Sequence, residues 1–108
     1  MEVEKIRIQL KKAAIEYSIL TLLSHGVSFA SGINEKLRES NLLFKESSLY
    51  PILKRFNDEN LLSFTWEESL KGPPGKRYFL TKKGKEVLKE LGASWDEIIN
   101  GLSTIQKN

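Results

Sequence analysis

The chain has 108 residues, with 17 Lys or Arg, 14 Asp or Glu, one histidine and no cysteine. This length is typical of one domain with one hydrophobic core. The absence of cysteine excludes thiol catalysis and cysteine-bound zinc, and one histidine excludes His clusters, so we expect neither an enzyme nor a bound metal ion or cofactor. No apolar run reaches the roughly 20 residues of a membrane span, and residues 1–4 do not resemble a signal peptide. We therefore expect a cytoplasmic protein.

Positive charge is concentrated in one part of the chain. Residues 69–85 carry six Lys or Arg and no acidic residue, whereas residues 86–108 carry four acidic residues and two lysines. A local excess of positive charge favours an anionic partner. The basic segment is therefore the first candidate for a binding surface.

The first predicted element is a long helix that ends at His25-Gly26, where glycine supplies the left-handed residue. Apolar residues recur in it at alternating spacings of three and four, which is typical of a helix that packs along one face. These residues, the first-helix stripe, are Val3, Ile6, Leu10, Ala13, Tyr17 and Leu20. A second apolar set follows from residue 15 onward and consists of Ile15, Ile19, Leu22 and Leu23. The second half of this helix is therefore expected to be buried on two sides.

Two shorter helices are expected next. Ser28 is predicted to cap a second helix that runs to about Arg38, with Phe29, Ile33 and Leu37 on its inner face. A third helix is predicted to begin near Ser47 or Ser48, with Pro51 in its first turn, where a missing N–H is harmless. The apolar residues of the third helix lie at i, i+3, i+4 and i+7 and predict its buried face: Leu49, Ile52, Leu53 and Phe56. The opposite side carries Ser47, Tyr50, Pro51, Lys54 and Arg55.

A β-hairpin and a last helix complete the chain. Asn60 is expected to end the third helix in the left-handed region. Leu62, Phe64 and Trp66 alternate with polar residues, which predicts a strand. Residues 71–76 read as a turn-forming loop and residues 77–81 as the returning strand. Thr81 is predicted to cap the last helix, whose apolar residues form the last-helix stripe: Leu88, Leu91, Trp95, Ile98, Leu102 and Ile105.

Three helices followed by a basic hairpin are the order of a winged helix-turn-helix, whose third helix enters the DNA major groove. The predicted fold class is therefore mainly α with a small β-hairpin. The predicted DNA contacts combine phosphate-binding cations with hydroxyl donors. They are Ser47, Ser48, Tyr50, Lys54 and Arg55 in the third helix, and Lys71, Lys76 and Arg77 in the hairpin. The alternative is a winged-helix module that binds a protein and no DNA.

Residues 48–56, with the sequence SLYPILKRF, resemble the recognition helix of PadR-type transcriptional regulators. Residues 17–23, residues 75–84 and Trp95 extend this resemblance over nearly the whole chain. The resemblance implies a homodimeric DNA-binding repressor with a winged-helix domain and one C-terminal dimerisation helix, as in the short branch of the family. Two segments depart from the family pattern, namely Phe29-Ala30-Ser31-Gly32 and Asn60, which replaces the usual glycine.

The two stripes favour a homodimer that binds an inverted-repeat operator, because a two-fold axis places two recognition helices about one DNA turn apart. We expect residues 1–82 to form the DNA-binding domain, with its first helix also in the dimer interface, and residues 83–108 to form the dimerisation helix. The predicted interface residues are Ile6, Leu10, Ala13, Leu91, Trp95, Ile98, Leu102 and Ile105.

Trp95 has two interpretations. The first places it in the apolar core of the dimer interface. The second follows from the resemblance to the multidrug-sensing branch of the family, in which Trp95, with Tyr17 and Ile99, would stack on a planar aromatic effector that releases the DNA. The sequence leaves both interpretations open.

Overall fold

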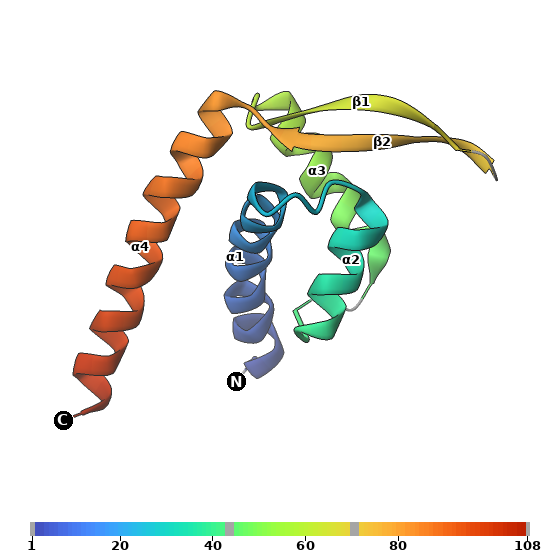
Figure 1. Ribbon diagram of the computed structural model, residues 1–108. Helices are drawn as coiled ribbons and strands as arrows, with labels where there is room; N and C mark the ends of the chain where they lie inside the picture. Colours follow the sequence, from blue (N-terminus) through green and yellow to red (C-terminus); the bar gives the residue numbers. More distant parts are fainter. Residues whose placement is uncertain (1, 43–44, 70–71, 108) are drawn as a thin grey trace.

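The computed structural model describes residues 2–42, 45–69 and 72–107, so Lys71 lies outside the described residues. The elements in chain order are α1 (Val3–Ser24), α2 (Ala30–Glu39), the 3-10 turn η1 (Glu46–Ser48), α3 (Leu49–Asp58), β1 (Leu62–Ser69), β2 (Gly72–Leu80) and α4 (Lys82–Gln106). The fold is mainly α with one antiparallel hairpin, as predicted. Three helices lie under the base of the hairpin, which extends clear of them to one side, and α4 runs down the other side (Figure 1).

The hydrophobic core lies where α1, α2, α3 and the base of the hairpin meet. Its buried residues are Ile19, Leu20, Leu23, Ile33, Leu37, Leu49, Leu53, Phe56, Leu61, Leu62, Tyr78 and Leu80. The predicted inner faces of the second half of α1 and of α3 therefore both contribute to the core. Burial of these faces, rather than the helical propensity of the short helices α2 and α3, accounts for most of their stability.

The start of α2 differs from the prediction. Ser28 does not cap the helix, because α2 begins at Ala30 and its N-cap residue is Phe29, whose backbone is extended. This extended segment pairs with the hairpin instead: the Tyr78 N–H donates to the Ser28 carbonyl oxygen (2.7 Å), and Phe29 forms a bridge with Arg77. The prediction that Phe29 lies on the inner face of α2 was also wrong, since its side chain is exposed.

The hairpin is longer than predicted, because the expected loop at residues 71–76 belongs mostly to β2. The register pairs Leu62 with Leu80 at the base and Trp66 with Lys76 farther out, and it reaches Ser69 and Gly72. Two prolines, at positions 73 and 74, lie inside β2. Proline is tolerated there because β2 is an edge strand, and an edge strand has N–H groups that need no partner.

The end of α3, the base of the hairpin and the start of α4 meet at one junction. Asn60 lies in the left-handed region, as predicted, with a φ of 61°, and turns the chain from α3 into β1. The Thr81 N–H donates to the Leu61 carbonyl oxygen (3.1 Å), and the Thr81 hydroxyl donates to the Asn60 carbonyl oxygen (2.7 Å). The same hydroxyl accepts the Gly84 N–H (3.0 Å), which confirms the predicted N-cap of α4. Gly84 packs so closely on Leu61 that a Cβ atom there would overlap the Leu61 carbonyl oxygen.

Large parts of α1 and α4 lie outside the core. Within the described part of α4, Gly84 alone is buried, and Ile98, Leu102 and Ile105 are exposed. Val3, Ile6, Ile8 and Leu10 are exposed on the first turns of α1. Among the described helices, none has the length and apolar character needed to cross a membrane.

Replacement of Gly84 by alanine tests the junction. We expect Gly84→Ala to lower the free energy of unfolding by about 1–3 kcal/mol, the usual cost of overpacking, because the new methyl group overlaps a backbone carbonyl. The measurement is urea unfolding followed by circular dichroism. Gly75→Ala is the matched control, since nothing lies within 4 Å of its Cβ position. Equal stability of the two variants would contradict the close approach of α4 to Leu61.

Candidate DNA-binding surface

The exposed side of α3 presents polar groups because its other side is anchored in the core. Leu49, Leu53 and Phe56 are buried, so Tyr50 and Lys54 on the opposite side face outward. Two further predicted residues, Ser47 and Ser48, lie exposed in η1, directly before α3. The structure therefore brings three of the five predicted contacts of this region, Ser47, Tyr50 and Lys54, to one side of α3. Ser48 lies on the side that faces α1.

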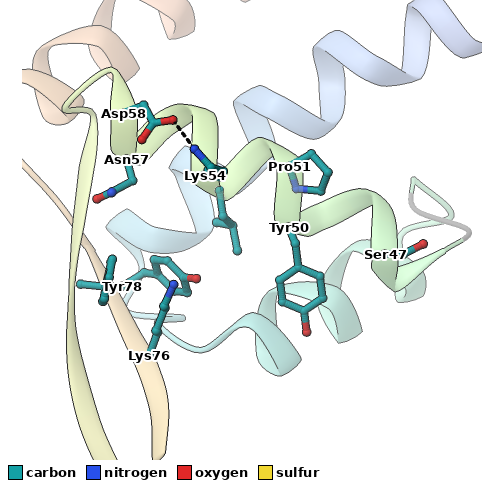
Figure 2. Close-up of a pocket in the computed structure, with 10 residues that line it drawn as sticks. Ser47, Tyr50, Pro51, Lys54, Asn57, Asp58, Lys76 and Tyr78 are labelled. Carbon is teal, nitrogen blue, oxygen red and sulfur yellow. Dashed lines mark hydrogen bonds and ion pairs between the residues drawn. The ribbon is translucent and has the colours of Figure 1, made fainter.

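A hollow of about 690 Å³ lies between α3 and the hairpin. We call it the helix–wing hollow, and its lining residues are Ser47, Tyr50, Pro51, Leu53, Lys54, Asn57, Asp58, Phe64, Lys76 and Tyr78. Tyr50 and Lys54 enter it from α3, and Lys76 and Tyr78 enter it from β2 (Figure 2). The fold thus joins cations that are 22 positions apart in the sequence.

The cation and the phenol on α3 both keep their protons. The Lys54 ammonium group donates to the Asp58 carboxylate (2.8 Å), and this hydrogen bond, together with the charge of Asp58, raises the pKa of Lys54. The Tyr50 hydroxyl donates to Glu46 Oε1 (3.4 Å). Partial burial, followed by the charge of Glu46 and this hydrogen bond, raises the pKa of Tyr50. Lys54 is therefore a cation and Tyr50 a hydrogen-bond donor at neutral pH.

Lys76 lies on the face of the hairpin that points toward α3. Its ammonium nitrogen is 4.4 Å from the centroid of the Phe64 ring and 5.3 Å from that of the Trp66 ring. Contacts of this kind hold a cation by its attraction to the aromatic faces. Beneath them Tyr78 is buried, and desolvation together with the nearby Tyr50 raises the pKa of Tyr78. The hairpin, which corresponds to the wing of a winged helix, therefore presents the Lys76 ammonium group above the Phe64 and Trp66 rings.

Three of the predicted contacts within the described residues are not part of this hollow. Ser48 lines a separate hollow beside α1, together with Lys12 and Ile52. Arg55 lies on the flank of α3 that faces α1, where its guanidinium group binds the Glu16 carboxylate and lies 3.6 Å from Glu59. Arg77 lies on the other face of the hairpin and binds the Glu67 carboxylate (3.1 Å). Each arginine is thus paired with an acidic residue and points away from Lys54 and Lys76.

Sequence reasoning did not select Trp66, which lies next to the helix–wing hollow. Trp66 lines an adjoining side hollow of about 370 Å³. The other lining residues of the side hollow are Phe29, Ala30, Ser31, Tyr50, Gly75, Lys76 and Tyr78. The alternation in residues 62–66 indicated that Trp66 shares a face with Leu62 and Phe64, but not that the hairpin extends beyond the core.

The candidate effector residues lie away from this surface, between α1 and α4. The rings of Tyr17 and Trp95 are 5.7 Å apart between centroids and inclined by 35°. They line a hollow of about 320 Å³, which we call the α1–α4 hollow, together with Ala13, Glu16, Leu20, Phe56, Leu61, Val87, Leu91, Ser94 and Ile98. Ile99, the third candidate, is exposed and does not line it. The described residues form no group of three His, Asp or Glu that could hold a metal ion.

Comparisons with known proteins agree with this arrangement. Residues 19–90 match the family described as "Transcriptional regulator PadR-like family". A PadR-like transcription factor from Bacteroides fragilis is 42% identical, with a TM-score of 0.78 over 94% of this chain and 98% of its own. A PadR-like transcriptional regulator from Bacillus cereus is 29% identical, with a TM-score of 0.81 over 93% and 98% of the two chains.

A third structure contains DNA. Bacillus subtilis PadR in complex with operator DNA is 30% identical, with a TM-score of 0.65 over 72% of this chain and 46% of its own. A search of curated protein sequences finds no match. The matched family covers most of the core, α3, the hairpin and the start of α4. The chain therefore belongs to the PadR-like family of transcriptional regulators, which are not enzymes.

Proposed function

We propose that this protein is a sequence-specific DNA-binding repressor that binds an inverted-repeat operator as a homodimer. The observation that carries the proposal is the helix–wing hollow, into which Lys54 and Lys76 bring positive charge from two different elements. Cations and hydroxyl groups are the donors that recognise phosphates and base edges. The complex of the related Bacillus subtilis PadR with operator DNA supports the same role here.

In this proposal α3 and the hairpin contact different parts of the DNA. The exposed side of α3 enters the major groove, where Tyr50 and Lys54 contact base edges and phosphate. Ser47 and Ser48 donate hydrogen bonds to phosphate at the N-terminus of the helix, which carries partial positive charge. Lys76 neutralises a phosphate from the side of the wing. Asp58 opposes this binding, because its carboxylate holds Lys54 and repels phosphate. Residues 1–82 form the DNA-binding part in this proposal.

The experiment is a salt series of DNA binding, measured by fluorescence anisotropy with labelled DNA from upstream of the protein's own gene and with a scrambled duplex. We expect Lys76→Ala to weaken binding and to reduce the slope of log affinity against log salt by about one, since one phosphate contact is lost. Asp58→Asn is the opposite control. It removes an acid from the hollow and should strengthen binding by about two- to fivefold.

Two outcomes would contradict the proposal. An unchanged salt slope in Lys76→Ala means that Lys76 does not contact phosphate. Equal and weak binding of both duplexes, with little dependence on salt, favours the alternative of a module that binds a protein and no DNA.

The homodimer is supported by the exposed stripes of α1 and α4. A single chain leaves Leu102 and Ile105 in water, and a second copy related by a two-fold axis can cover them with its own α1, where Ile6 and Leu10 are exposed. We expect the wild type to sediment at twice the mass of the chain and Leu102→Asp to sediment as a monomer, because the variant puts an unpaired charge in the interface. Asn100→Asp, which adds a charge away from the stripe, should remain a dimer. A dimeric Leu102→Asp would contradict the interface.

The effector is supported by the Tyr17 and Trp95 rings that line the α1–α4 hollow. We propose that a planar aromatic compound binds beside Trp95 and releases the DNA. Trp66→Phe leaves Trp95 as the sole tryptophan, so we expect such compounds to quench its emission over the concentration range in which DNA is released. Release of DNA without quenching would place the effector site elsewhere.

A further inference from the structure

Trp66 is a large apolar side chain that the core does not explain. Its side chain is 65% exposed, and among the exposed large apolar residues of the described chain only Leu10 and Ile105 exceed it, at 69% and 71%. Leu10 and Ile105 belong to the stripes that we assign to the second copy. Trp66 belongs to β1 of the hairpin, and the hairpin extends away from α4 (Figure 1).

The indole of Trp66 is held in place although it is exposed. It meets the Phe64 ring edge to face, with centroids 5.8 Å apart and planes at 89°, and Phe64 in turn lies 5.9 Å from the ring of the buried Tyr78. The Lys76 ammonium group lies over both the Phe64 and the Trp66 rings. A side chain fixed in this way loses little conformational entropy when a ligand covers it.

Trp66 also borders the space that we assign to DNA. The side hollow that it lines shares Tyr50, Lys76 and Tyr78 with the helix–wing hollow, so the two hollows adjoin at these side chains. A ligand that contacts Tyr50 and Lys76 from the side hollow therefore lies against the indole of Trp66.

The chemistry of the surface around Trp66 and Lys76 fits a nucleic acid strand. DNA carries phosphates beside apolar sugar and base faces, and the wing presents a cation, Lys76, beside an apolar ring, Trp66. Apolar side chains that contact DNA in this way pack against sugars or enter between base pairs in the minor groove. An acidic protein segment would use Lys76 but offers no row of planar or sugar faces to the indole.

We infer that Trp66 is a DNA-contacting residue of the wing, whose indole packs on the sugar or base face of the strand that Lys76 binds through phosphate. This inference rests on the proposed DNA-binding function. It adds an apolar contact to the polar contacts predicted from the sequence. Because no charge is involved, the contact strengthens binding without changing the number of phosphates neutralised.

The test compares Trp66→Ala with Phe79→Ala. Phe79 is 45% exposed on the opposite face of the same hairpin and is the matched control. With labelled DNA from upstream of the protein's own gene, we expect Trp66→Ala to weaken binding at least about fivefold, since stacking of one ring on nucleic acid is worth that much or more. We also expect its salt slope to equal that of the wild type and Phe79→Ala to bind as the wild type does.

A second readout does not depend on the folding of the alanine variant. Trp95→Phe leaves Trp66 as the sole tryptophan, and we expect its emission to be quenched when the same DNA is added. Circular dichroism melting of all variants identifies any that fail to fold.

The outcomes separate the inference from the proposed function. If the Trp95→Phe variant binds the DNA as tightly as the wild type but its Trp66 emission does not change, the inference is wrong and the proposed function stands. The same holds if a folded Trp66→Ala variant binds as tightly as the wild type. An equal loss in Phe79→Ala also overturns the inference, because it indicates general damage to the hairpin. If the wild type binds neither duplex, both fail; quenching of Trp66 by an acidic peptide instead of DNA would then assign the wing to a protein partner.

Discussion

The arrangement of the whole molecule depends on the hydrogen bonds that join residues 60, 61 and 81. Thr81 donates to the carbonyl oxygens of Asn60 and Leu61, and its hydroxyl caps α4. The end of α3, both strands of the hairpin and the first turn of α4 are thereby fixed to one point. The angle between α3 and the hairpin, which sets the width of the helix–wing hollow, follows from this one junction. The direction in which α4 leaves the hairpin follows from it as well.

The hairpin changes its chemistry along a single face. From base to tip the paired residues are Leu62 with Leu80, Phe64 with Tyr78, and Trp66 with Lys76. The first pair is buried, the second is partly covered by α3 and the third is in contact with solvent. The face that anchors the hairpin in the core therefore continues, without a break, into the face that we propose binds DNA. Ring contacts link the exposed Trp66 through Phe64 to the buried Tyr78 near the base.

Features of the fold that depend on neighbouring residues could be predicted from the sequence. Features that depend on contacts between distant segments could not. The apolar spacing of α3, the left-handed Asn60 and the cap at Thr81 depend on neighbours within a few residues, and all three were predicted correctly. Ser28 was misassigned because its segment pairs with β2, which follows about 50 residues later. The direction of the Arg55 side chain depends on its ion pair with Glu16 in another helix. The exposure of Trp66 depends on how far the hairpin extends beyond the core. The spacing of apolar residues within one element predicts neither the ion pair of Arg55 nor the exposure of Trp66.

The two prolines of β2 protect the extended hairpin from self-association. Beyond the bridge between Phe29 and Arg77, the outer edge of β2 has no neighbouring strand in the described structure, and the hairpin carries exposed aromatic residues. Such an edge is a template on which a strand of another molecule can add. Pro73 and Pro74 have no N–H group to donate, so the edge cannot extend a continuous ladder there. The hairpin can therefore keep aromatic residues exposed while resisting edge-to-edge aggregation.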